Sequence, residues 1–262
     1  MSVASSTIPR DPIAPWAEIV PNAPPATVDD LLRLPDDGWQ YEVVQGVLVR
    51  MAGSGQQATA LGAKLLARLF VHVEARGLGV VTGADGVYKF PGAETGLLPD
   101  VGFYHQARQS LIKDPTKPVP FAPDFAIEVA SPSQGSPEMT DKALTYISNG
   151  TGEVWIFWPE SRQVDVWRSR NAGDAGDYVT YQPRPLPLIA IDDVSPDLRD
   201  VFTRRDEYTY NLPVNHHPSG DMSGVLGVGN GPGIYTIRSS VVEGFTLSLD
   251  DLFPLFPNSF MP

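Results

Sequence analysis

Hydrophobic residues recur with helical spacing in one long segment, at about residues 57–75. Every fourth position carries an aliphatic side chain there, which predicts a helix with one buried stripe. The basic residue and the glycine of Arg76-Gly77 are typical of a helix end. The residues of the stripe are Leu61, Leu65, Leu69 and Val73.

A second helix is indicated by its end signals as much as by its stripe. Ser136 is in the position of an N-cap, Pro137 in the first helical position and Glu138 in the first turn, while Asn149-Gly150 ends the helix. Its apolar stripe consists of Met139, Ala143 and Ile147.

Between and around these helices, short runs of β-branched and aromatic residues predict strands. Residues 41–51 read as a strand pair or as one long bent strand, with Gly46 as the break, and a short helical turn capped by Thr27 precedes them. The other predicted strands are GVVTG, GVYKF, residues 100–104, residues 125–130, EVWIFW and QVDVWR. This order of strands and helices predicts an α/β fold, in which helices flank a mixed β-sheet.

Composition divides the chain into three parts. Residues 1–26 form a proline-rich N-terminal arm, and residues 27–170 hold the periodic elements of the predicted core. Residues 171–262 are a C-terminal extension. Its Gly/Pro-rich segment 171–243 is interpreted as an insertion or a β appendage, and residues 244–253 form a closing strand and helical turn.

Charge and cysteine content restrict the classes of function. The formal net charge of −12 argues against tight non-specific binding to DNA, because a basic surface supplies most of that affinity. The absence of cysteine excludes disulfides and thiolate metal sites. No apolar run is long enough for a membrane span and the N-terminus does not resemble a secretory signal, so a cytoplasmic protein is expected.

Two acidic residues stand out because of the parity of their strands. Alternate side chains of a strand face opposite sides, so Asp100 shares a face with Gly102, and Glu128 shares one with Ala126 and Ala130. If the two strands are neighbours, the small residues leave an acidic hollow. Such a hollow fits a hydrated Mg²⁺ or Mn²⁺ that carries a phosphate oxygen.

Lys142 lies in the second turn of the second helix, beside its apolar stripe. From there its side chain could extend along the sheet towards the acids, where an ammonium group stabilises negative charge on a phosphate. The alternative is an ordinary ion pair with Glu138 on a solvated helix face. Glu42, in the first predicted strand pair, could contact a metal or a water, or be purely structural.

Four motifs in order resemble the Uma2 family of endonucleases, which belong to the restriction-endonuclease-like, PD-(D/E)XK superfamily. The resemblance covers about residues 28–170, together with GFTLSLDDLF near the C-terminus. The motifs that carry it are YEVVQG, PDVGF, APDFAIEVASPS and DKALTYISNGTGEVWIFWP.

The resemblance implies a mixed central sheet and metal-dependent phosphodiester hydrolysis, with DNA as the substrate and a homodimer as a possible assembly. It identifies Asp100 as the acid of the PD motif and Glu128 as the second acid, the two metal ligands. The catalytic lysine, which this family carries on the following helix, is Lys142, and Glu42 is the early glutamate.

A nuclease fold that has lost catalysis and serves as a binding or assembly module is the alternative. The acidic charge favours it, as does Gln56-Gln57 where the family often places a histidine. A phosphodiesterase acting on RNA or on a small nucleotide is a third interpretation. Four aromatic residues more readily pack the sheet than stack on bases, and they are Trp155, Phe157, Trp158 and Trp167.

Overall fold

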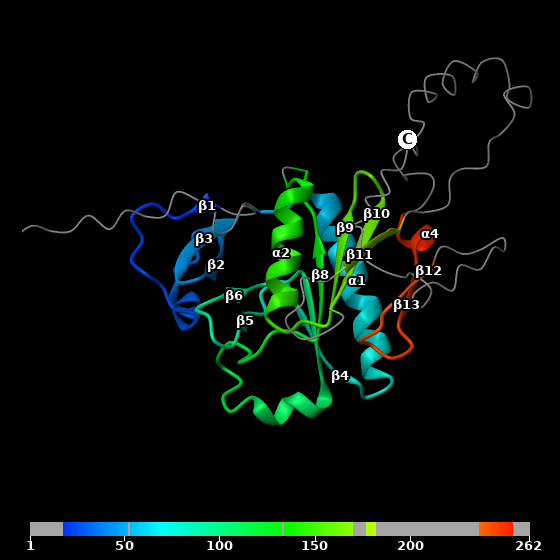
Figure 1. The fold of residues 1–262 in the computed structure, drawn as a ribbon, viewed down its shortest axis with the longest axis horizontal. Coiled ribbons are helices and arrows are strands. Elements are labelled where there is room, and N and C mark those ends of the chain that lie inside the picture. The colour runs from blue at the N-terminus through cyan, green and yellow to red at the C-terminus, as the bar shows by residue number, and fades with distance from the viewer. Residues whose placement is uncertain (1–17, 52, 133, 170–176, 182–235, 254–262) are drawn as a thin grey trace, which may run out of the picture. The chain divides into compact units, whose positions relative to one another are not determined.

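The computed structural model describes residues 18–51, 53–132, 134–169, 177–181 and 236–253. At the centre of the fold is a six-stranded sheet with the strand order β11-β10-β9-β8-β7-β4 (Figure 1). Only β8 and β9 run parallel, and every other neighbouring pair in this sheet is antiparallel. The mixed sheet of the sequence prediction is therefore confirmed. Its strands are β4 (Gly79–Gly83), β7 (Val101–His105), β8 (Phe125–Val129), β9 (Glu153–Trp158), β10 (Gln163–Arg168) and β11 (Asp177–Tyr181).

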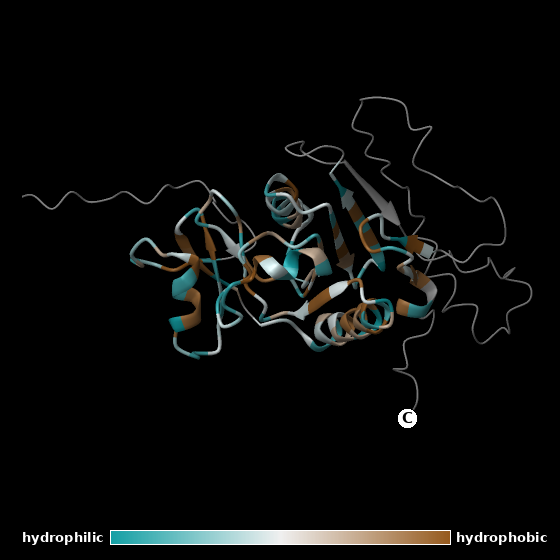
Figure 2. Ribbon diagram, turned by 90° about the horizontal axis from the view of Figure 1, so that it is seen from below, coloured by the Kyte–Doolittle hydropathy of each residue, from teal (hydrophilic) through white to brown (hydrophobic). Residues whose placement is uncertain are grey.

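Two helices cover opposite faces of this sheet. Helix α1 (Gln56–Glu74) and helix α2 (Ser136–Ser148) lie on either side of it in the view of Figure 2. Helix α2 connects the parallel strands β8 and β9, as parallel neighbours require a crossover. Both helices therefore hold side chains against strands that carry the candidate acids.

In a second sheet, of order β1-β3-β2-β6-β5, the strands on either side of Gln45-Gly46 form a hairpin, so the strand pair is the alternative that holds. Gln45 and Gly46 both have positive φ angles, 51° and 79°, as a two-residue hairpin turn requires. Residues 18–19 of the predicted arm pair with β3, whereas residues 1–17 lie outside the described residues. The elements of this region are β1 (Glu18–Ile19), the 3₁₀ helix η1 (Val28–Arg33), β2 (Gln40–Val44), β3 (Val47–Met51), β5 (Tyr88–Lys89) and β6 (Gly96–Leu97); the 3₁₀ helix η2 (Gln106–Leu111) follows β7 of the central sheet.

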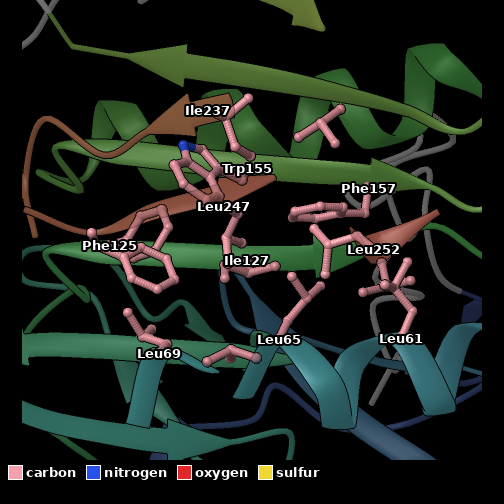
Figure 3. Packing of buried hydrophobic residues seen from close by; sticks show 14 of the residues in the cluster. Leu61, Leu65, Leu69, Phe125, Ile127, Trp155, Phe157, Ile237, Leu247 and Leu252 are labelled. Atoms are coloured by element: carbon pink, nitrogen blue, oxygen red, sulfur yellow. The ribbon is translucent and has the colours of Figure 1, made fainter. Parts of the chain in front are cut away.

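The main hydrophobic core lies between α1 and the central sheet (Figure 3). The predicted stripe of α1 is fully or almost fully buried, with Leu65 and Leu69 0% exposed, and it packs against Phe125, Ile127 and Trp155. The C-terminal elements also pack into this core, through Ile237, Leu247 and Leu252 among others. These elements are β12 (Thr236–Arg238), β13 (Thr246–Ser248) and α4 (Leu249–Leu252).

The predicted C-terminal extension is thus closely integrated where the structure describes it. Strand β11 pairs with β10 along five residues and extends the central sheet, and β12 pairs with β13. The closing strand and helical turn predicted in residues 244–253 are β13 and α4, whereas the prediction assigned no strand to residues 177–181. Segment 182–235 lies outside the described residues, and the domain boundaries stay predictions.

The start of α2 differs by one residue from the prediction. Its N-cap is Gly135, not Ser136, so Ser136 and Pro137 both lie inside the first turn. The reason is that the Glu138 carboxylate accepts a hydrogen bond from the backbone N–H of Gly135 at 2.9 Å. The end of the helix is as predicted, with Gly150 at a φ of 100° directly after Asn149.

Candidate functional site

The faces of β8 are those that strand parity predicts. Phe125, Ile127 and Val129 belong to the core under α1, whereas Ala126 and Ala130 pack in the cluster under α2. Glu128 therefore faces α2, and it is only 5% exposed. A carboxylate this deeply buried needs a partner with charge or with hydrogen-bond donors.

Lys142 is that partner. Its ammonium lies 3.1 Å from Oε2 of Glu128 and 3.4 Å from Oε1 of Glu42, and its side chain is 4% exposed. Glu42 also accepts a hydrogen bond from the backbone N–H of Leu98 at 2.9 Å. The alternative in which Lys142 pairs with Glu138 is wrong, because Glu138 caps the helix start.

Tyr146 belongs to the same cluster, although the sequence prediction did not include it. Its hydroxyl donates a hydrogen bond to Oε1 of Glu128 at 2.7 Å, and the residue is 0% exposed. The signal that could have identified it is its position four residues after Lys142, on the same face of α2. Each oxygen of the Glu128 carboxylate thus has a donor from α2.

Asp100 lies directly before β7, at the edge of this cluster. Its Oδ2 accepts a hydrogen bond from the backbone N–H of Val129 at 2.7 Å, which holds it at the end of β8. It also lines a cavity of about 240 Å³ beside α1, whose other lining residues include Ser54, Ala58 and Gly62. No hydrogen bond or ion pair between Asp100 and Lys142 is seen in the described residues, but their charges attract.

The predicted acidic hollow is therefore much smaller than expected. On the α2 face, the side chains of Lys142 and Tyr146 occupy the space over Glu128. Beside Gly102 the missing side chain leaves no hollow, because the ring of Tyr88 fills the space. Asp100 does line a cavity, the one of about 240 Å³ beside α1.

Gly102 gives a test of this packing. A Cβ atom added there would lie 2.5 Å from the Tyr88 hydroxyl oxygen and 2.7 Å from Oγ1 of Thr82, both of which are too close. We expect Gly102→Ala to lower the free energy of unfolding by about 1–3 kcal/mol, measured by urea denaturation. The matched control is Gly62→Ala in α1, where nothing lies within 4 Å of the new Cβ. Helix propensity should make that control more stable by about 0.5–1 kcal/mol, and equal effects of both changes would contradict the packing at Gly102.

The site has more acidic than basic groups, because three carboxylates lie near the one ammonium of Lys142. Burial raises the pKa of Glu128 to about 8, Lys142 opposes this rise, and the nearby carboxylates of Asp100 and Glu42 add to it. Burial likewise raises the pKa of Asp100. The charges of Glu128, Glu42 and Asp100 hold the pKa of Lys142 above its usual range, so this residue is a permanent cation. Three carboxylates against one ammonium leave a formal charge of −2 when all are ionised.

This donor set fits a hard divalent cation. Mg²⁺ binds through oxygen and commonly uses one or two carboxylates, while waters and substrate phosphates complete its coordination. Within the described part of the chain, no group of three or more acidic, histidine or cysteine residues is close enough to form a complete protein cage. Asp100 and Glu128 therefore fit an ion that keeps several waters, and the excess negative charge favours its binding.

The other residues considered from the sequence have structural roles where they are described. Trp155, Phe157 and Trp167 are buried in the sheet packing, as predicted. His72 belongs to α1, and its ring nitrogen lies 2.9 Å from the backbone oxygen of Glu243. Helix α1 covers the face of the sheet opposite to α2, so His72 lies away from Glu128 and Lys142. Two further features of the sequence, the adjacent histidines His216 and His217 and the glycine-rich segment GVGNGPG, lie outside the described residues. Among the described helices, none combines the length and the apolar content that a membrane span requires.

Comparisons with known proteins identify the family and the fold. The family model described as "Uma2: Putative restriction endonuclease" matches residues 28–202, which is more than half of the chain. A solved structure with a similar fold is titled as a "putative nuclease belonging to DUF820" from Anabaena variabilis. It is 19% identical, covers 68% of this chain and 98% of its own, and aligns with a TM-score of 0.50. A comparison with curated proteins found no match. The chain therefore belongs to the Uma2 family and has the α/β, restriction-endonuclease-like fold of a nuclease.

Proposed function

We propose that this protein hydrolyses phosphodiester bonds with the help of a divalent metal ion, and that it is an endonuclease acting on DNA. The observation that carries the proposal is the buried ion pair of Lys142 with Glu128 at 3.1 Å, near Asp100, whose charge affects the pKa of both residues. The family and the fold are those of nucleases, and restriction-endonuclease-like enzymes generally use divalent metals.

Asp100 and Glu128 are the proposed metal ligands, with Mg²⁺ or Mn²⁺ as the ion. When bound, such an ion supplies positive charge to the scissile phosphate and lowers the pKa of a water molecule. Asp100 is fixed for this role by the Val129 backbone, and Glu128 by the two donors from α2. The cavity that Asp100 lines together with residues of α1 is the proposed path by which a phosphate group approaches Asp100.

Lys142 is the proposed catalytic cation. Its high pKa keeps the ammonium charged at every physiological pH, so it can stabilise the negative charge that develops on the phosphate. Glu42 contacts Lys142 at 3.4 Å, and this contact supports a role in positioning Lys142. A contact of Glu42 with a metal ion or a water, as the sequence suggests, stays a prediction.

DNA is proposed as the substrate because of the family, with weak non-specific affinity because of the net charge of −12. Cleavage of both strands of a duplex requires two sites, which is the reason to propose a homodimer. The same acidic charge is the specific observation that favours the second candidate function, a nuclease fold that binds without cleaving.

The test compares the wild-type protein with Asp100→Asn in two measurements. Calorimetric titration with Mn²⁺ should show binding that weakens by about tenfold or more in Asp100→Asn, because one anionic ligand is lost. Incubation with supercoiled plasmid DNA should show nicking in Mg²⁺ or Mn²⁺ that disappears with a chelator and in the variant. Metal binding without any cleavage would favour the binding module, and equal Mn²⁺ affinity in both proteins would refute the metal site.

A further inference from the structure

Tyr146 lies in an apolar part of the core, where burying a hydroxyl group costs free energy unless the hydroxyl is hydrogen-bonded. It is 0% exposed, and its ring packs edge-on against Phe90 at a centroid distance of 5.7 Å. A phenylalanine would fill the same volume among these apolar neighbours. A buried hydroxyl is tolerated only when its hydrogen bond is made, and here the bond runs to Oε1 of Glu128 at 2.7 Å.

The two donors of α2 fix the carboxylate of Glu128 in one orientation. Lys142 contacts Oε2 at 3.1 Å, and Tyr146 contacts Oε1 from one helical turn later. The terminal torsion of a glutamate is broad when nothing restrains it. With a donor on each oxygen, rotation about that bond breaks both contacts, so the orientation is kept.

The two oxygens also differ in what surrounds them. Oε2 lies beside the ammonium of Lys142, which contacts Glu42 and whose charge is felt by Asp100. Oε1 accepts its hydrogen bond from the Tyr146 hydroxyl, which makes no other hydrogen bond within the described residues. Lys142 keeps its contact with Glu42 if it yields Oε2 to an ion, so Oε2 is the oxygen that an ion can share with Asp100.

We propose that Tyr146 is a positioning residue of the metal site, which occupies Oε1 of Glu128 and leaves Oε2 as the single oxygen that binds the divalent ion. The inference rests on the proposed function, because it assumes that Glu128 is a metal ligand. Tyr146 lies within the motif DKALTYISNGTGEVWIFWP, and this inference gives it a role that neither the motif nor the comparisons assign.

The test uses two variants that each lose one buried phenol hydroxyl. Tyr146→Phe removes the contact with Glu128. Tyr88→Phe is the matched control, because Tyr88 is also 0% exposed and its hydroxyl bonds Thr82 at 2.9 Å, away from Glu128. Loss of a residue that orients a metal ligand typically weakens metal affinity by about 10- to 100-fold. We therefore expect Mn²⁺ to bind Tyr146→Phe at least about tenfold more weakly in calorimetry, and Tyr88→Phe with wild-type affinity.

Crystal structures with Mn²⁺ give a second readout, which a purely structural role would not change. The wild-type protein should coordinate the ion through Oε2 of Glu128 alone. In Tyr146→Phe the carboxylate should turn or chelate the ion with both oxygens.

Three outcomes overturn the inference. Wild-type affinity in Tyr146→Phe does so while leaving the proposed function intact, provided that Asp100→Asn still binds the ion weakly. An equal loss in Tyr88→Phe does so as well, because it would show a general effect of core hydroxyls. If the wild-type protein shows no Mn²⁺ binding that depends on Asp100, the proposed function and this inference fail together.

Discussion

Replacing Lys142 with methionine should slow metal-dependent cleavage by roughly 100- to 1,000-fold and at the same time tighten Mn²⁺ binding by about tenfold. The first effect is the loss of the cation that stabilises charge on the phosphate. The second arises because the ammonium lies among the carboxylates that the ion would bind, 3.1 Å from Glu128 and 3.4 Å from Glu42. A fixed positive charge at this distance repels a second cation strongly, even at an effective dielectric constant of about 20.

Competition by protons opposes the gain in Mn²⁺ affinity and reduces it to about tenfold. Without the ammonium, protons compete more strongly for Glu128, whose pKa burial already raises to about 8. Because that pKa already includes the lowering by Lys142, the pKa of Glu128 lies higher still in the variant, so the titration should be repeated at rising pH and the gain in affinity should grow with pH. Before metal is added, the variant should be less stable than the wild type by about 3 kcal/mol, since two carboxylates lose their partner. Added Mn²⁺ should recover much of that loss, because ligands that bind only the folded state stabilise it.

The control is Lys117→Met, which removes an exposed lysine outside the cluster. Both its cleavage rate and its Mn²⁺ affinity should equal those of the wild type. Weaker Mn²⁺ binding in Lys142→Met would contradict the argument, because it would mean that the ammonium organises the carboxylates for the ion and does not compete with it.

Local patterns were sufficient to predict most elements of the fold. The stripe of Leu61, Leu65, Leu69 and Val73 predicts α1 to within one residue at each end, because side chains at this spacing must share one face. Strand β11 was missed because its pairing partner, β10, is what makes residues 177–181 a strand. The short sequence DYVTY, next to a Gly- and Asp-rich segment, carries too little pattern of its own.

The site was predictable in its charged residues and unpredictable in its packing. Parity placed Glu128 on the face of α2, and spacing placed Lys142 within reach, as the ion pair confirms. The filled space beside Gly102 depends on Tyr88, which comes from the second sheet, and no local pattern reveals such a contact. The hydroxyl of Tyr146 was missed for a similar reason, since an aromatic residue at a helical spacing is equally consistent with an apolar core.

The second large effect that we predict is the loss of folding stability when Glu153 is replaced. This residue at the start of β9 is 0% exposed and accepts hydrogen bonds from Arg168, Ser239 and Ser240. The indole N–H of Trp155 donates to it as well, at 2.9 Å. One carboxylate thereby connects the central sheet to the segment that precedes β13.

Glu153→Gln should lower the free energy of unfolding by about 3–5 kcal/mol in urea denaturation. The amide that replaces Oε1 or Oε2 is itself a donor, so it faces Ser239, Ser240 and Arg168 groups that also donate, and some of these are left without an acceptor. Glu160→Gln, at an exposed position in the turn after β9, should change stability by less than about 0.5 kcal/mol. A loss of less than about 1 kcal/mol in Glu153→Gln would show that water or a neighbouring group replaces the carboxylate.

The same variant distinguishes two ways in which the C-terminal elements could be attached. Ile237, Leu247 and Leu252 pack on the core under α1, so the segment 236–253 should unfold together with the central sheet in a single transition. If the hydrogen bonds of Glu153 alone held the segment, Glu153→Gln would instead release it at low urea, before the sheet unfolds. Limited proteolysis at increasing urea separates these cases, because early cleavage near residues 239–241 requires local release. We expect cleavage there to coincide with the loss of tryptophan burial, since apolar contacts of this segment remain when the carboxylate is gone.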